Sequence, residues 1–207
     1  MEEQKPQAAD LENKLNSNPE GKTPSPFAAA LQREHPEWVA HEVEALGETT
    51  IIVPREYIVA ACHFLKKEPG LNFNFLSDVC GFDRGPEEEP RFEVNYHLFS
   101  TTRFHRLRLK VLLNEDDAHV PTVTGVWRTA NWHERETFDL FGVIFDGHPD
   151  LRRILLYDEF KGYPLRKDYP VNLVQPRVPE RPVDGTFVDE RSRNKLLRLQ
   201  KSLGSKI

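Results

Sequence analysis

The sequence predicts an α+β domain: a mixed, largely antiparallel sheet with helices on one side, followed by an extended C-terminal arm. Two stretches, residues 91–100 and 105–113, alternate apolar and polar residues, as strands with one covered face do. A third strand is expected at residues 72–80. Stretches with helical spacing precede and follow these strands, and this order is typical of α+β folds.

The elements before these strands follow from local signals. Residues 1–25 are polar, contain several prolines and have no hydrophobic period, so we expect a flexible arm. Ser25 can cap a helix over residues 26–33. Residues 38–46 and 49–53 predict a hairpin, and residues 55–67 carry apolar side chains at helical spacing. The outward residues of the last strand, Arg106, Arg108 and Lys110, lie beside an acidic loop, a pattern typical of a solvated sheet face.

Composition excludes several classes of function. The chain has 207 residues, of which 38% are hydrophobic, enough for one packed core. A net charge of −5, without a cluster of interleaved basic and aromatic residues, argues against nucleic acid as the main partner. The apolar runs fall far short of the roughly 20 residues of a membrane span. We therefore expect a protein that is either soluble or peripheral to a membrane through another protein.

Two cysteines, Cys62 and Cys80, indicate a reducing compartment. Both are flanked by apolar residues, so we expect buried free thiols rather than a disulfide. The acidic start of the sequence has neither the apolar core of a secretion signal nor the Arg-rich character of a transit peptide. These features predict a bacterial cytoplasmic location.

Residues 130–171 form the most distinctive stretch, because charged and aromatic residues are interleaved throughout it. This density predicts charges packed against aromatic rings. Asn131 is the expected N-cap of a helix over residues 132–141, with Glu134 at the capping-box position and Gly142 as the C-terminal stop. Glu136 lies on the same helical row as Trp132, so we expect its carboxylate to be buried and to need an arginine or backbone donor.

The composition changes after residue 170. Residues 171–207 begin with a proline-rich stretch that cannot build a core and continue into a basic, weakly amphipathic segment. We expect this part to be an extended arm along a partner subunit, with simple disorder as the alternative. The domain itself is predicted to span residues 26–170.

Independent catalysis finds little support in the sequence. A zinc helix of the metalloprotease type needs two histidines four residues apart, and two cysteines are too few for an iron–sulfur cluster. Neither a dinucleotide fingerprint nor a phosphate loop is present. An acid/base hydrolase using Glu134, Glu136 and His148 stays open as an alternative, although nothing supplies a nucleophile or a cofactor around them.

The central stretch closely resembles the 30 kDa subunit of respiratory complex I, which in bacteria is the C subunit of NADH:quinone oxidoreductase. The resemblance is long and ungapped there, and a weaker similarity extends upstream to about Thr49. Tyr163 stands where many relatives have His. The motif residues that we expect to form an interface or structural site are Glu134, Arg135, Glu136, Asp139, Gly142, His148, Pro149, Asp150, Arg152, Arg153, Arg166, Lys167 and Asp168.

The resemblance implies a non-catalytic structural subunit in the peripheral arm of a proton-translocating enzyme, on the cytoplasmic face of the bacterial inner membrane. It implies packing against iron–sulfur neighbours and chiefly against the 49 kDa subunit, which helps to form the quinone site. We call this neighbour the quinone-site subunit. It also implies that this chain binds no cofactor or metal, since NADH, FMN, the iron–sulfur clusters and quinone belong to the complex. Related membrane-bound hydrogenases and dehydrogenases carry similar subunits, so the electron donor stays open.

Overall fold

A computed structural model describes residues 24–176. The predicted flexible arm at residues 1–25 and the C-terminal arm at residues 171–207 therefore lie mostly outside the described residues. The chain divides into two units, Met1–Val174 and Gln175–Ile207, and all the described helices and strands belong to the first.

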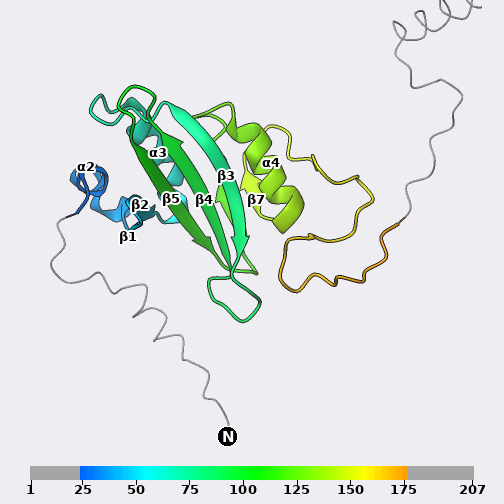
Figure 1. Ribbon diagram of the computed structural model, residues 1–207. Coiled ribbons are helices and arrows are strands. Elements are labelled where there is room, and N and C mark those ends of the chain that lie inside the picture. Colours follow the sequence, from blue (N-terminus) through cyan, green and yellow to red (C-terminus); the bar gives the residue numbers. More distant parts are fainter. Residues whose placement is uncertain (1–23, 177–207) are drawn as a thin grey trace, which may run out of the picture. The chain divides into compact units, whose positions relative to one another are not determined.

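The first unit is built on a five-stranded sheet in the order β1-β2-β5-β4-β3 (Figure 1). Its strands are β1 (His41–Ala45), β2 (Glu48–Ile52), β3 (Phe75–Asp83), β4 (Phe92–Phe99) and β5 (Arg106–Leu113). The α-helices are α2 (Pro26–Glu34), α3 (Ile58–Lys67) and α4 (Ala130–Phe141), and two short 3₁₀ helices are η1 (Pro36–Trp38) and η2 (Arg55–Tyr57). A separate two-stranded sheet pairs β6 (His119–Pro121) with β7 (Ile144–Asp146).

The sheet is mixed, as predicted. Strands β3, β4 and β5 are antiparallel neighbours, β1 and β2 form the predicted hairpin, and β2 runs parallel to β5. Alternate residues of β4 and β5 are buried on one face, where they join Ala61, Cys62 and Leu65 of α3 in a single core. Helix α3 therefore covers one face of the sheet (Figure 1).

Local signals explain where the elements begin. Ser25 caps α2 as predicted, because its Oγ accepts a hydrogen bond from the Ala28 N–H at 3.2 Å. Strand β3 begins at Phe75, three residues later than predicted. Asn72 has a φ of +46°, outside the strand region, and the side chains of Asn72 and Asn74 bond to Thr102 and Thr101 instead.

Both cysteines are free, as predicted. Cys62 is completely buried, and burial raises the pKa of its thiol. Cys80 is half-buried on the other face of the sheet, where its Sγ lies 3.7 Å from Nε2 of His97, and burial raises its pKa too. Neither thiol is therefore ionised at neutral pH. Among the described helices, none has the length and apolar character needed to cross a membrane.

Candidate functional site: a charged segment fastened to α4

Helix α4 begins differently from the prediction. Its N-cap is Thr129, without a side-chain cap, so the expected Asn131 cap and the Glu134 capping box are wrong. Glu134 turns into the core instead, because the loop before the helix has buried donors to satisfy. Its Oε1 accepts the Val123 N–H at 2.8 Å, and its Oε2 accepts the hydroxyl of Thr122.

Glu134 is fully buried, and its hydrogen-bond partners within residues 24–176, Thr122 and Val123, carry no positive charge. Burial raises the pKa of its carboxyl to about 7, although the hydrogen bonds from Thr122 and Val123 act in the opposite direction. The hydroxyl of Tyr96, which has no hydrogen-bond partner within residues 24–176, is buried in the same core. The interior beneath α4 therefore contains one carboxyl group, that of Glu134, whose pKa lies near neutral pH.

The C-terminal end of α4 is confirmed. Gly142 has a φ of +77°, and its N–H bonds to the Phe138 carbonyl at 2.8 Å. This position also has no room for a side chain, because a Cβ on residue 142 would lie 2.5 Å from Cε2 of Tyr163. Gly142 thus allows the segment after the helix to fold back over it.

Helix α4 covers the edge strand of the sheet. The Thr137 hydroxyl donates to the Val79 carbonyl at 3.1 Å, which satisfies an acceptor on the edge strand β3. Gly81 lets the helix approach, since a Cβ there would meet the Phe141 ring at 2.6 Å. These contacts place α4 beside β3 (Figure 1).

Asp139 holds the segment that follows the β7 strand. Its carboxylate is completely buried: Oδ1 accepts Nη1 of Arg153 at 2.8 Å, and Oδ2 accepts the backbone N–H groups of residues 154–156 at 3.0, 2.8 and 2.8 Å. Burial alone would raise the pKa of this carboxyl, but the N–H of Leu156, the Arg153 guanidinium and the other two amides together lower it. Asp139 therefore stays ionised and shapes a turn that has no regular secondary structure.

Two arginines pack against aromatic rings, as the sequence predicted. Arg153 lies 5.4 Å from the Tyr163 ring centroid, and its Nη2 donates to the Gly162 carbonyl. Arg166 lies 4.8 Å from the rings of both Phe92 and Tyr163, and its Nε donates to the Phe141 carbonyl at 2.6 Å. Each guanidinium thus links an aromatic ring to the backbone.

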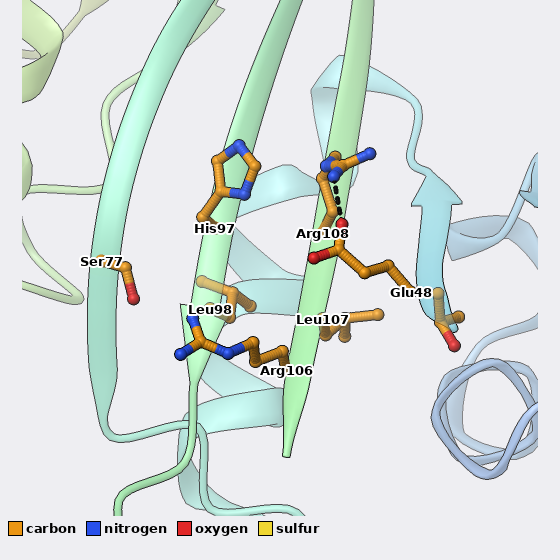
Figure 2. A pocket seen from close by; sticks show the side chains of 8 residues that line it. Glu48, Ser77, His97, Leu98, Arg106, Leu107 and Arg108 are labelled. Atoms are coloured by element: carbon orange, nitrogen blue, oxygen red, sulfur yellow. Dashed lines mark hydrogen bonds and ion pairs between the residues drawn. The ribbon is translucent and has the colours of Figure 1, made fainter. Parts of the chain in front are cut away.

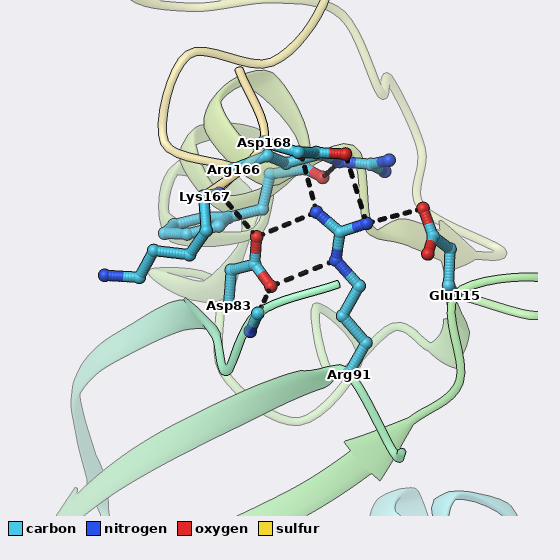
Figure 3. A network of polar contacts seen from close by, with 8 residues as sticks. Asp83, Arg91, Glu115, Arg166, Lys167 and Asp168 are labelled. Carbon is cyan, nitrogen blue, oxygen red and sulfur yellow. Dashed lines mark hydrogen bonds and ion pairs between the residues drawn. The ribbon is translucent and has the colours of Figure 1, made fainter. Parts of the chain in front are cut away.

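A second buried charge cluster centres on Arg91 (Figure 3). Its side chain is only 2% exposed and forms a bidentate pair with Asp83, at 3.0 Å for both contacts. It also donates to Glu115 at 2.6 Å and to Asp168 at 2.7 Å. Asp83 accepts the Lys167 backbone N–H as well, at 2.7 Å. The cluster therefore joins the sheet to the end of the motif.

The other motif residues occupy the surface of the segment. Arg135 donates to the carbonyls of Arg152 and Arg153 at 3.0 Å each. Nδ1 of His148 accepts the Asp150 N–H, so the neutral ring donates from Nε2 to the Asn131 carbonyl at 3.1 Å. Arg152 pairs with Asp150 in an exposed bidentate contact. The side chains of Pro149 and Lys167 are exposed, and the Lys167 ammonium lies 5.9 Å from the Phe82 ring.

The expected burial of Glu136 is wrong. Glu136 is exposed, and so is Trp132, at 62%. The helix turns its Glu134 and Asp139 carboxylates inward instead. The three groups of the hydrolase hypothesis thus have different surroundings: Glu134 lies in the core, Glu136 lies in solvent, and His148 is used in a turn.

Sequence reasoning missed Asp83 and Arg91. They lie 8 residues apart, and Arg91 lies 77 residues before Asp168, so spacing gives no sign of the cluster. One signal was available: Arg91 directly precedes the alternating strand, between an acidic loop and a core phenylalanine. Within residues 24–176, no group of three or more His, Cys, Asp or Glu side chains is placed to hold a metal ion.

The fold and the site together define an α+β domain that carries an irregular surface segment fastened by buried ion pairs. The profile of the family described as "Respiratory-chain NADH dehydrogenase, 30 Kd subunit" matches residues 51–174. The chain therefore belongs to the 30 kDa subunit family of the respiratory-chain NADH dehydrogenase. The match includes the whole motif and both buried charge clusters.

Similar proteins carry consistent names. The C 2 subunit of NADH-quinone oxidoreductase from Rhizobium meliloti (strain 1021) is 57% identical over 127 residues, which cover 61% of this chain and 69% of the relative. The C subunit of the same enzyme from Roseiflexus sp. (strain RS-1) is 48% identical over 141 residues, 68% of this chain and 80% of the relative. A chain in the structure of an archaeal membrane-bound sulfane sulfur reductase shares the fold, with a TM-score of 0.60 and 24% identity over 70% of this chain and 85% of that one.

Proposed function

We propose that the protein is a non-catalytic structural subunit in the peripheral arm of a proton-translocating NADH:quinone oxidoreductase. In this role it packs against the quinone-site subunit, on the cytoplasmic face of the bacterial inner membrane. NADH, FMN, iron–sulfur clusters and quinone are bound by other subunits. Membership of the 30 kDa subunit family supports the assignment to the complex.

One observation carries the structural role: the buried charges of the motif and of the Arg91 cluster are engaged with the chain itself. Asp139 binds three backbone amides and Arg153, while Arg91 binds three carboxylates. Ionised groups that are hydrogen-bonded in this way hold the backbone in place. They are poorly suited to accept protons from a substrate or to donate protons to it. They leave a segment of fixed shape between α4 and the end of the domain.

Helix α4 and this segment present apolar side chains to solvent. Trp132, Leu155 and Leu165 are 62%, 61% and 49% exposed. The Arg135 guanidinium lies 5.5 Å from the Trp132 ring and is itself held by two carbonyls of the segment. Tryptophan and arginine are enriched among the residues that dominate interface energies, and a rigid presentation lowers the entropy cost of binding. We therefore assign this surface to the contact with the quinone-site subunit.

The test is Trp132→Glu in the full-length chain. Loss of a central aromatic anchor should weaken copurification with the quinone-site subunit by about tenfold or more, because a hot-spot residue contributes at least roughly 2 kcal/mol. The melting transition of the isolated chain should not change, since Trp132 is exposed. Leu46→Glu is the matched control, because Leu46 is fully exposed at the β1–β2 turn. Equal copurification of both variants would contradict the assignment.

A further inference from the structure

A second exposed surface lies on the outer face of the sheet. Phe75 of β3 is directly opposite Phe99 of β4, which is directly opposite Arg106 of β5. The three residues share a face, since their sequence neighbours Leu76, Leu98 and Leu107 are buried on the other. Arg106 lies 4.9 Å from the Phe99 ring centroid. The register therefore places two aromatic rings and a guanidinium in one row.

The turn between β4 and β5 adds a third ring at a conformational cost. Phe104 is 80% exposed and has a φ of +55°, which bulky side chains rarely adopt. Its N–H bonds to the Ser100 carbonyl at 2.8 Å, and its ring lies 6.5 Å from Phe99 in an edge-on arrangement. Residues held in such sparsely populated backbone regions cluster at active sites and ligand-binding positions.

This turn is held rigidly by the loop before β3. Asn74 bonds to Thr101 twice, at 2.7 and 3.0 Å, and the His105 ring bonds to the Leu71 carbonyl at 2.7 Å. Arg103 donates to the Pro69 carbonyl at 3.2 Å. The turn that carries the exposed ring is thus preorganised, which favours a binding role over a mobile tip.

The charges around the row are unbalanced. On β5, Arg108 pairs with Glu48 and Lys110 pairs with Glu93, whereas Arg106 has no acidic partner within residues 24–176. A hollow of about 50 Å³ adjoins it. Figure 2 shows the Arg106 side chain reaching over β4, toward the strand that carries Ser77. Ser77 stands at an irregularity in the β3–β4 register, and such bulges redirect side chains near functional sites.

We propose that this aromatic–arginine surface, formed by Phe75, Phe99, Phe104 and Arg106, binds a segment of another protein in which an Asp or Glu stands next to aliphatic residues. The carboxylate pairs with Arg106, with the Ser77 hydroxyl as a second donor. The aliphatic side chains pack on the rings of Phe99 and Phe104. This surface is formed by other residues than the surface around Trp132. Its partner is identified by charge complementarity with the Arg106 guanidinium.

The test is photo-crosslinking in intact cells that produce the full chain with its native partners. Phe104 is replaced by p-benzoylphenylalanine, which keeps an aromatic ring, and the crosslinked peptides are identified by mass spectrometry. The expected product joins position 104 to an acidic and aliphatic segment of a different chain. Arg106→Glu should lower its yield by about tenfold or more, and changing the contacted acid to Arg should restore it.

The same label at Leu46, exposed on the β1–β2 turn, is the control, and its crosslinks should not respond to Arg106→Glu. A product with a second copy of this chain, a product with a segment that lacks Asp and Glu, or no product would each overturn the proposal. So would a yield that Arg106→Glu leaves unchanged. Because illumination precedes purification, this result is independent of the copurification that tests the proposed function.

Discussion

Arg91 shows how one residue can hold distant parts of the chain together. It is buried against Asp83 at the end of β3, and the same guanidinium reaches Asp168 at the end of the motif. A buried cation of this kind is stable only while its carboxylates stay in place. The shape of the segment before Asp168 therefore depends on a residue far from it in sequence.

Arg91→Met should destabilise the domain by roughly 3 to 5 kcal/mol, because it leaves the buried carboxylate of Asp83 without its cation. Urea unfolding of the isolated chain measures this difference. Arg152→Met is the control: Arg152 pairs with Asp150 on the surface, where solvent screens the charges, so its unfolding curve should barely move. Similar losses in the two variants would contradict the distinction between buried and exposed pairs.

Glu134 should make stability depend on pH. Burial raises the pKa of its carboxyl from the ordinary 4.5 to about 7 in the folded chain, so the folded state binds this proton more tightly than the unfolded state. Its contribution to stability is therefore greatest below pH 4.5 and is lost as the pH rises through 7, up to roughly 3 kcal/mol. Glu134→Gln should flatten this part of the profile.

The matched control is Glu136→Gln on the same helix, where the side chain is exposed. The free energy of unfolding is measured at several pH values between about 5 and 8. Its slope against pH should be the same in Glu136→Gln as in the unaltered chain. If Glu134→Gln kept that slope as well, Glu134 would not be the titrating group.

The comparison of Glu134 with Glu136 shows where sequence reasoning fails at this scale. The helical row through Trp132 predicts that Glu136 is buried, but the tryptophan ring itself is exposed. The capping box predicted for Glu134 is a pattern within the helix itself. The donors that Glu134 actually binds belong to the preceding loop. Periodicity cannot distinguish an apolar residue that faces the core from one that faces a partner.

At the scale of elements, the sequence was more informative. Alternation in β4 and β5 identified the strands and their buried face, because each apolar side chain contributes to the same core. The Gly142 stop was predictable for a local reason, the need for a left-handed residue after the helix. The parallel β2–β5 pair and the α4–β3 contact were not predictable residue by residue, because they depend on tertiary packing.

Gly142→Ala tests the junction between α4 and the segment. The left-handed backbone costs a non-glycine residue about 1 to 2 kcal/mol, and the new Cβ would also displace the Tyr163 ring. Thermal unfolding should therefore show a clear loss, and limited proteolysis should cut the segment faster. Gly125→Ala is the control, since a Cβ there meets nothing within 4 Å. If Gly142→Ala left both the thermal unfolding and the rate of proteolysis unchanged, the segment would not be held against the end of the helix.

At the scale of the whole molecule, the described residues form a sheet domain with two exposed surfaces of different character. The surface around Trp132 continues the fastened motif, whereas the aromatic–arginine surface lies on the outer face of the sheet. Family membership could be recognised from the motif alone, because the run of charged and aromatic residues is long and ungapped. The two buried ion clusters that hold the motif in place could be seen only in the structure.

The measurement that tests the structural role most directly is quinone reduction by membranes carrying Asp139→Asn, normalised to the amount of assembled complex. The substitution removes the charge that holds Arg153 and three backbone amides. We predict less assembled complex and unchanged turnover per complex. A fully assembled complex with reduced turnover would contradict this account, because the motif would then act in the chemistry itself.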